Sequence, residues 1–149
     1  MILVGQYDSP FVRRAAVALH LHGIAFERRV HSVFTHLEEI RAVNPLGKVP
    51  VLILEDGSAL PDSRAIIEWL EARAPRMTLA EPTEMLAIEA VAIGLAEKTY
   101  ERGIETSRRA VQDPGWTARL EGQIASALAW LEARASGPFM VGDALTRAD

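Results

Sequence analysis

Residues 44–54 read NPLGKVPVLIL, and this stretch places a proline inside a run of apolar residues. Proline has no backbone N–H to donate to a neighbouring strand, so it is normally confined to edge strands or to the entry of a strand. Such an ordinary strand proline is one interpretation of Pro50. The other is a cis proline that turns the backbone of Val49 outward, where its N–H and C=O can pair with a peptide-like ligand. Both interpretations predict a strand over residues 49–54.

The residues before this stretch predict two strand–helix pairs. Pro10 suits the first turn of a helix, where its missing N–H is no loss, and Gly23 is a natural C-terminal cap. Thr35 is a candidate N-cap for the next helix. The expected elements are strands over residues 1–4 and 25–30 and helices over residues 11–22 and 36–43.

The residues after it predict a hairpin and a further helix. Asp56-Gly57 is a two-residue hairpin signal, and a strand over residues 58–60 follows it. Asp62-Ser63 then cap a helix over residues 64–73. The resulting order is β-α-β-α-β-β-α. A parallel βαβ unit followed by a hairpin and a helix predicts a thioredoxin-like α/β domain with a mixed four-stranded sheet.

The second half of the chain has a different character, because no strand candidate occurs in it before Phe139. Apolar residues at helical spacing predict one helix over residues 83–109 and another over residues 116–131. The expected domains are a thioredoxin-like domain over residues 1–75, a linker over residues 76–82 and the start of an all-helical domain over residues 83–149.

Composition narrows the class of protein. Of the 149 residues, 49% are hydrophobic and 24% are charged, as in a globular domain, and the net charge of -4 argues against a nucleic-acid partner. The absence of cysteine excludes disulfides, thiolate metal sites and a thiol nucleophile on the protein. The chain has no signal-like N-terminus and no run of about 20 apolar residues. We therefore expect a cytoplasmic protein with no membrane partner. The four histidines show no metal-ligand spacing, so we expect them to be structural and expect no metal.

Asp62-Ser63 has two interpretations. Both residues are good helix caps and can serve only that purpose. However, the free N–H groups at a helix N-terminus also bind carboxylates, and Asp62 would add a partner for an ammonium group. A free amino-acid end carries both groups.

Ser9 has two interpretations as well. It can be an ordinary N-cap, or it can donate a hydrogen bond from its hydroxyl to an anion near the positive end of the helix. Tyr7 is a nearby rival donor. Arg13 and Arg14 on the same helix either add positive potential there or form a solvated or salt-bridged face.

Three stretches, taken together and in this order, resemble the glutathione S-transferase superfamily. They are SPFVRR at residues 9–14, NPLGKVPVL at residues 44–52 and LPDSRAI at residues 60–66. The ending FMVGDALTRAD, residues 139–149, also resembles the capping box of that family, in which Thr146 caps a helix and Asp149 reaches back to it. With serine at position 9, the resemblance is to the serine-type bacterial members.

The resemblance implies a glutathione site in the N-terminal domain. It makes Ser9 the catalytic residue, which would donate a hydrogen bond to the glutathione sulfur. The backbone of Val49 would hold the cysteinyl part and Asp62 and Ser63 the γ-glutamyl end. The glutathione-binding residues expected in all are Phe11, Lys48, Val49, Pro50, Asp62 and Ser63. Phe34, His36 and Lys48 stay open as partners of the glycine carboxylate.

The implied activity is that of a homodimeric transferase for detoxification, in which the glutathione thiolate attacks a small hydrophobic electrophile. Two alternatives stay open, since a fold does not fix a reaction. One is a glutathione-dependent isomerase, dehalogenase or peroxidase, and the other is a non-catalytic glutathione-binding stress protein. Members of this family usually continue for several more helices. Asp149 lies inside the capping box, so we expect the helical domain to be truncated.

Overall fold

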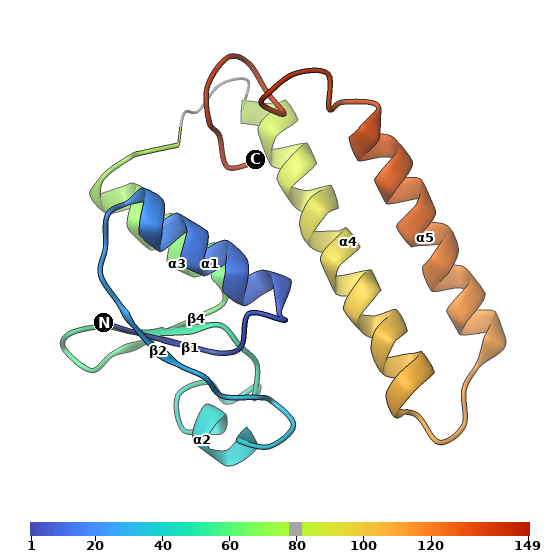
Figure 1. The fold of residues 1–149 in the computed structure, drawn as a ribbon, viewed down its shortest axis with the longest axis horizontal. Helices are drawn as coiled ribbons and strands as arrows, with labels where there is room; N and C mark the ends of the chain where they lie inside the picture. The colour runs from blue at the N-terminus through green and yellow to red at the C-terminus, as the bar shows by residue number, and fades with distance from the viewer. Residues whose placement is uncertain (78–81) are drawn as a thin grey trace. The chain divides into compact units, whose positions relative to one another are not determined.

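The computed structural model describes residues 1–77 and 82–149, which form two compact units, Met1–Arg76 and Met77–Asp149. In the first unit, shown from blue to green in Figure 1, strands alternate with helices. Its elements are β1 (Ile2–Val4), α1 (Pro10–Leu21), β2 (Glu27–Arg29), α2 (Leu37–Arg41), β3 (Val51–Ile53), β4 (Ala59–Pro61) and α3 (Ser63–Arg73).

The four strands form one mixed sheet in the order β2-β1-β3-β4. β1 pairs in parallel with β2 and antiparallel with β3, and β3 pairs antiparallel with β4. The predicted β-α-β-α-β-β-α order and the mixed four-stranded sheet are therefore confirmed.

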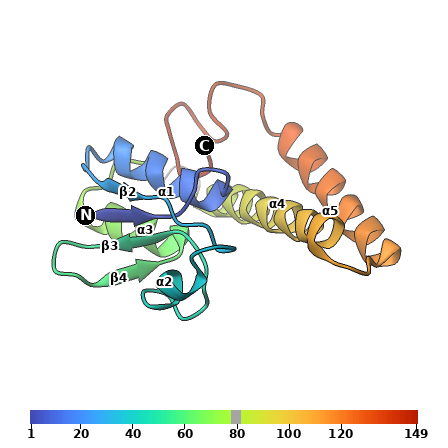
Figure 2. The same ribbon diagram turned by 60° about the horizontal axis from the view of Figure 1, so that its bottom comes forward.

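The sheet has helices on both faces, and Figures 1 and 2 show α1 and α3 together on one side of it and α2 on the other. Successive side chains of a strand point to opposite faces. Val4 of β1 and Val51 of β3 form one buried cluster with Ile40 of α2. Their neighbours Leu3 and Leu52, 1% and 0% exposed, therefore point to the face that α1 and α3 cover. Apolar packing thus fixes the strands from both sides.

Three local expectations differ from the structure. β2 spans only Glu27–Arg29 instead of residues 25–30, because its side chains are charged and form the edge of the sheet. The hairpin is not a two-residue turn: Leu54 donates to the carbonyl of Ser58, and Gly57, at φ 84°, donates back to Leu54, which leaves three residues between them. Thr35 does not cap α2. Its hydroxyl contacts the His36 ring instead, and His36 holds the N-cap position.

A polar contact joins the ends of α1 and α3. The His22 ring lies 2.7 Å from a carboxylate oxygen of Glu71, and the His22 side chain is 1% exposed. The same carboxylate accepts hydrogen bonds from the backbone N–H of Arg76. His22 therefore has a structural role, as expected of the histidines.

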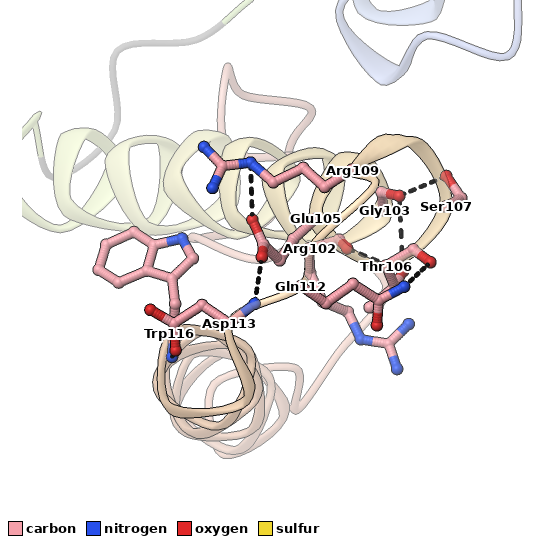
Figure 3. Close-up of polar contacts among 9 residues, drawn as sticks. All are labelled: Arg102, Gly103, Glu105, Thr106, Ser107, Arg109, Gln112, Asp113 and Trp116. Carbon is pink, nitrogen blue, oxygen red and sulfur yellow. Dashed lines mark hydrogen bonds and ion pairs between the residues drawn. The ribbon is translucent and has the colours of Figure 1, made fainter.

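The second unit contains a helical hairpin formed by α4 (Pro82–Arg108) and α5 (Pro114–Glu132). Glu105 is 3% exposed and closes this hairpin, as Figure 3 shows. One of its carboxylate oxygens accepts from the Asp113 N–H at 2.7 Å, and the other lies 3.1 Å from Nε of Arg109. Asp113 in turn caps α5 by accepting from the Trp116 N–H. A buried carboxylate thus sets the start of the second helix.

Within the described residues 82–149 the regular structure is entirely helical. None of the helices in the described part of the chain is long and apolar enough to cross a membrane. The predicted linker, residues 76–82, falls largely on residues 78–81, which lie outside the described residues.

The last residues pack back onto α4 and contain the expected capping box. The hydroxyl of Thr146 accepts from the Ala148 N–H at 3.1 Å, and the Asp149 carboxylate accepts from the Thr146 N–H at 2.7 Å. Val141 lies in a buried cluster with Met85 and Ile88 of α4. Arg147 also forms an ion pair of 3.1 Å with Glu89, whose side chain is 6% exposed. The contacts of the predicted capping box are therefore present, but within residues 146–149 they close a turn and not the first turn of a helix.

Candidate functional site

The three sequence stretches singled out above meet at one end of the sheet. Val4, the last residue of β1, is opposite Val51, the first residue of β3, and Val51 is opposite Pro61, the last residue of β4. The loop that follows β1, the segment that precedes β3 and the turn that follows β4 therefore lie at the same edge. The Asp62 N–H, which donates to the Pro50 carbonyl at 3.2 Å, ties two of these segments directly together.

The Val49-Pro50 peptide bond is cis, which selects the second of the two interpretations of Pro50. Val49 is half-buried, and its backbone N–H and C=O form no hydrogen bond with the described residues. β3 begins two residues further on, so this pair of backbone groups is left free beside the sheet. An extended peptide binds such a pair as a neighbouring strand would.

A buried asparagine shapes the loop before the cis proline. Asn44, 4% exposed, donates from its side-chain amide to the Lys48 carbonyl at 2.8 Å and accepts from the Leu46 N–H at 3.1 Å. The loop turns at Gly47, which has φ 63° and lies so close to Leu37 that a Cβ would be 2.7 Å from its methyl carbon. Asn44 and Gly47 thus hold the segment that carries Val49. In the sequence, Asn44-Pro45-Leu46-Gly47 predicts the turn that ends the preceding helix, but not the hydrogen bonds by which Asn44 holds this loop.

Gly5 is a second residue whose role becomes clear only in the tertiary structure. It follows β1 with φ 134°, and a Cβ there would lie 2.5 Å from Cγ2 of Val12 and 3.0 Å from Cβ of Val49. β1 therefore leaves the sheet through a space between α1 and the Val49 segment that only glycine fits. The available signal was an isolated glycine directly after an apolar strand.

Ser9 is the N-cap of α1, and its hydroxyl oxygen accepts from the Val12 N–H at 3.4 Å. A hydroxyl has one hydrogen and two lone pairs, so accepting this bond leaves its hydrogen for another acceptor. The capping role and the donor role are therefore compatible. The residue is half-buried at the end of the helix where backbone N–H groups concentrate positive potential. The ring of its rival Tyr7 lies against the Arg28 guanidinium, whose carbon is 3.6 Å from the ring centre.

Asp62 and Ser63 form the N-terminus of α3. Asp62 adopts the unusual φ of 76°, is exposed, and caps the helix by accepting from the Arg64 N–H at 2.7 Å. Ser63 is 3% exposed, and its hydroxyl oxygen accepts from the Arg14 guanidinium at 3.4 Å. This helix end presents an acidic side chain and a hydroxyl hydrogen, together with the N–H groups of its first turn.

Three other predicted residues are less closely tied to this edge. Phe11 is half-buried in the first turn of α1, and Lys48 has an exposed side chain beside Val49. Phe34 is 50% exposed in the loop before α2. The adjacent Val33 packs against the cluster of α2, β1 and β3 that Val49 also contacts. That loop therefore lies on the α2 face, on the same side as Val49.

His36 in the same loop has a defined proton arrangement. Its Nδ1 accepts from the Ser32 N–H at 3.3 Å and lies 2.8 Å from the Thr35 hydroxyl. A backbone N–H can only donate, so Nδ1 carries the lone pair and the proton is on Nε2. The ring stacks on His31 with centroids 4.6 Å apart. Nε2–H is thus a donor, and it has no acceptor within the described residues.

No group of three or more His, Asp or Glu side chains within the described residues has the arrangement of a metal site. The groups that this edge does present are a free backbone pair, two hydroxyl donors, a carboxylate and the ends of two helices. Such a set complements an extended peptide with a free amino-acid end and an anionic group.

Comparison with known proteins identifies a matching family. Residues 3–82 match the family described as glutathione S-transferase, N-terminal domain. The GST-like protein YibF of Escherichia coli is 39% identical over 117 residues, which make up 75% of this chain and 58% of YibF. The probable glutathione S-transferase BZ2 of Zea mays is 33% identical over 121 residues, 79% of this chain and 48% of BZ2. The chain thus spans about half the length of these curated relatives.

Solved structures extend the similarity to both units. A glutathione S-transferase of Methylobacterium radiotolerans in complex with glutathione sulfonate has a TM-score of 0.90 at 27% identity. The match covers 99% of this chain and 73% of the transferase chain. One from Methylobacillus flagellatus with glutathione bound has a TM-score of 0.88 at 26% identity, covering 99% and 76%. A maleylacetoacetate isomerase of Methylobacterium extorquens with malonate and glutathione bound has a TM-score of 0.77 at 27% identity, covering 99% and 77%.

Proposed function

The chain belongs to the glutathione S-transferase superfamily, and from that premise we propose that it binds glutathione and conjugates its thiolate to a small hydrophobic electrophile. The observation that carries the proposal is the free backbone pair of Val49 beside the cis Pro50. It lies at the same sheet edge as Ser9 and the Asp62-Ser63 helix end. Residues 1–75 would form the glutathione-binding domain and residues 83–149 the helical domain.

The proposed pose follows from the chemistry of each segment. The cysteinyl part of glutathione pairs with the backbone of Val49, next to Pro50 and Lys48. The α-carboxylate and ammonium of the γ-glutamyl end meet the N-terminus of α3, with Asp62 as the partner of the ammonium. The sulfur then faces the N-terminus of α1, where Ser9 caps the helix. Phe11, half-buried in the first turn of α1, lines the same end.

Among the candidates for the glycine carboxylate, we favour His36 over Phe34 and Lys48. Its Nε2–H is a donor fixed by the two contacts at Nδ1, whereas Phe34 has no polar side-chain group. Lys48 has a flexible, exposed side chain that must lose rotamer freedom on binding. A preorganised neutral donor gives a carboxylate contact at a smaller entropic cost.

The role of Ser9 is to favour the thiolate. A free thiol titrates near roughly 8.5, so only a few per cent of it is ionised at neutral pH. Lowering that pKa by about two units takes roughly 2.7 kcal/mol of preferential interaction with the anion. One hydrogen bond to a charged group contributes about 1.5–3 kcal/mol and a helix N-terminus about 0.3–1 kcal/mol more. The two together are of the required size.

The proposal is tested in two stages. Retention on immobilised glutathione, with elution by free glutathione, tests whether the site binds. Turnover of a model aryl halide by the wild type and by Ser9→Ala then tests the chemistry. We expect Ser9→Ala to lower turnover while the dissociation constant of glutathione stays similar. Unchanged turnover would remove Ser9 from the mechanism and favour Tyr7, for which Tyr7→Phe is the matched variant.

A second candidate is a glutathione-dependent isomerase. It is favoured by the similarity to the maleylacetoacetate isomerase of Methylobacterium extorquens and to that of Pseudomonas aeruginosa, which is 36% identical over 84 residues. Assays with isomerisable unsaturated acids and with peroxides would separate these reactions from conjugation. A homodimer and a cytoplasmic location, as well as a role in detoxification, accompany the proposal as expectations from the family.

A further inference from the structure

The residue that reaches the predicted γ-glutamyl contact from another helix is Arg14. It lies on α1, one turn after the Ser9 cap, and its Nη1 is 3.4 Å from the hydroxyl oxygen of Ser63 at the start of α3. Ser63 is 3% exposed, and Arg14 is the only hydrogen-bond partner of its hydroxyl among the described residues. α1 therefore carries the proposed thiolate donor at its end and, five residues later, a contact to the opposite end of the proposed site.

This contact fixes the direction of the Ser63 hydrogen. A guanidinium has five donors and no acceptor, whereas a hydroxyl has one donor and two acceptor lone pairs. The Ser63 oxygen must therefore accept from Arg14, and the hydroxyl hydrogen cannot point back at the guanidinium. It is left for an acceptor on the other side of the oxygen. The positive charge on Arg14 also polarises the hydroxyl, which strengthens it as a donor.

The other polar groups of this helix end add to the same arrangement. Asp62 accepts from the Arg64 N–H, and its backbone carbonyl accepts from the Ile66 N–H. The N–H groups of Ser63 and Ala65 form no hydrogen bond with the described residues. Two N–H donors and one oriented hydroxyl donor are thus left at the start of an 11-residue helix. A carboxylate has the two oxygens needed to accept from them.

We propose that Arg14 is a positioning residue, which holds Ser63 as an acceptor so that its hydroxyl hydrogen is presented to the α-carboxylate of the γ-glutamyl group. The inference rests on the proposed function, because it assigns that carboxylate to this helix end. It adds a residue on a different helix that acts on the carboxylate through Ser63. Its consequence is selectivity for a ligand that carries the carboxylate, rather than affinity for any tripeptide thiol.

The test compares two ligands in calorimetric titrations of the full chain. One is glutathione and the other is its analogue in which the γ-glutamyl α-carboxylate is an amide. We expect Arg14→Gln to weaken glutathione about tenfold and the amide analogue by less than about twofold, because the lost contact is with the carboxylate. In a Ser63→Ala background, adding Arg14→Gln should weaken glutathione binding further by less than about twofold.

Arg13→Gln is the matched control, since it removes the same charge from the adjacent, exposed position of the same helix. It should change both affinities by less than about twofold. If Arg14→Gln does not fold, Arg14→Lys answers the same question. Lysine keeps the charge but lacks the planar fork that reaches Ser63, so the ratio of the two affinities should still fall several-fold.

Three results would overturn the proposal. Equal weakening of both ligands by Arg14→Gln would show a general structural role, and full additivity with Ser63→Ala would show that Arg14 does not act through that hydroxyl. An unchanged affinity for glutathione in a folded Arg14→Gln variant would show no role at all. Each differs from failure of the proposed function, in which the wild-type chain binds neither ligand.

Discussion

The α/β unit and the helical unit hold their backbones in place by different means. In the first, residues such as Leu3, Leu52 and Ile66 are 0–1% exposed, and the sheet is covered on both faces. In the second, the only fully buried side chain of α5 is that of Leu120, while Leu128 is 53% exposed. Besides the apolar cluster of α4, its hairpin contains a buried carboxylate, Glu105, whose contacts Figure 3 shows.

This difference explains where a precise site can form. Close-packed apolar side chains leave few alternative arrangements, so the loops that leave the sheet start from fixed points. The free backbone pair of Val49 can stay unpaired because the cluster of Val4, Ile40 and Val51 holds its surroundings. A helical hairpin with few buried side chains has no equivalent support, and its buried carboxylates must be satisfied to keep it closed.

The largest expected effect is on the α/β unit, from Gly5→Ala. The positive φ of 134° is unfavourable for alanine, and its Cβ would lie 2.5 Å from Val12 and 3.0 Å from Val49. Strain and overpacking each cost about 1–3 kcal/mol, so we expect a loss of about 3 kcal/mol or more in the free energy of unfolding. Chemical denaturation would measure it.

Gly57→Ala is the matched control for that change. Gly57 also has a positive φ, 84°, but a Cβ there has no neighbour within 4 Å. Gly57→Ala should lower the free energy of unfolding by only about 1 kcal/mol, which is the cost of the positive φ alone. Similar losses for the two variants would contradict the close approach at Gly5.

The next effect is on the helical unit, from Glu105→Gln. The neutral amide loses the charge that serves both the Asp113 N–H and Arg109, so we expect the unit to lose about 2 kcal/mol of stability. Hydrogen exchange of the α5 amides should rise in the variant. Glu101→Gln, at a half-exposed ion pair with Lys98, should change the stability by less than about 0.5 kcal/mol. Equal effects would show that burial of Glu105 does not matter.

A smaller effect is expected from Thr146→Val at the capping box. The valine keeps the volume but removes the hydroxyl that accepts from the Ala148 N–H and contacts Asp149. Loss of such a cap typically costs about 1 kcal/mol. The melting temperature should fall by a few degrees. Thr83→Val, at an exposed position near the start of α4, serves as the control and should leave it unchanged.

The smallest effect is expected at the β3–β4 turn, from Asp56→Asn. A hydrogen bond from the Ser58 hydroxyl, together with one from the Ser58 N–H, lowers the pKa of the Asp56 carboxyl. A lowered pKa contributes stability above the unfolded value, and that contribution is lost as the pH falls through the folded value. The melting-temperature difference between wild type and variant should therefore be present at neutral pH and disappear in acid. A difference that grows in acid would contradict this assignment.

The sequence predicted the fold well where local signals were strong. Pro10, Gly23 and Asp62 marked helix boundaries because capping depends only on neighbouring residues. Prediction failed where two local arrangements compete for the same polar group. Thr35 has the right side chain for a cap, but the His36 ring lies close enough to take its hydroxyl. The hairpin gained a residue because the Leu54 N–H bonds to the Ser58 carbonyl just beyond the end of the ladder.

By itself, the sequence determined the order of elements and the residue types at the candidate site, Ser9, Val49-Pro50 and Asp62-Ser63. These follow from periodicity, capping and motif spacing, which are local along the chain. Only the tertiary structure decided that the three segments share one sheet edge, that Gly5 must be glycine and that Arg14 reaches Ser63. Those facts depend on strand register and helix packing, which join residues up to 51 positions apart, such as Ile2 and Ile53. Contacts of that range leave no local signal in a single sequence.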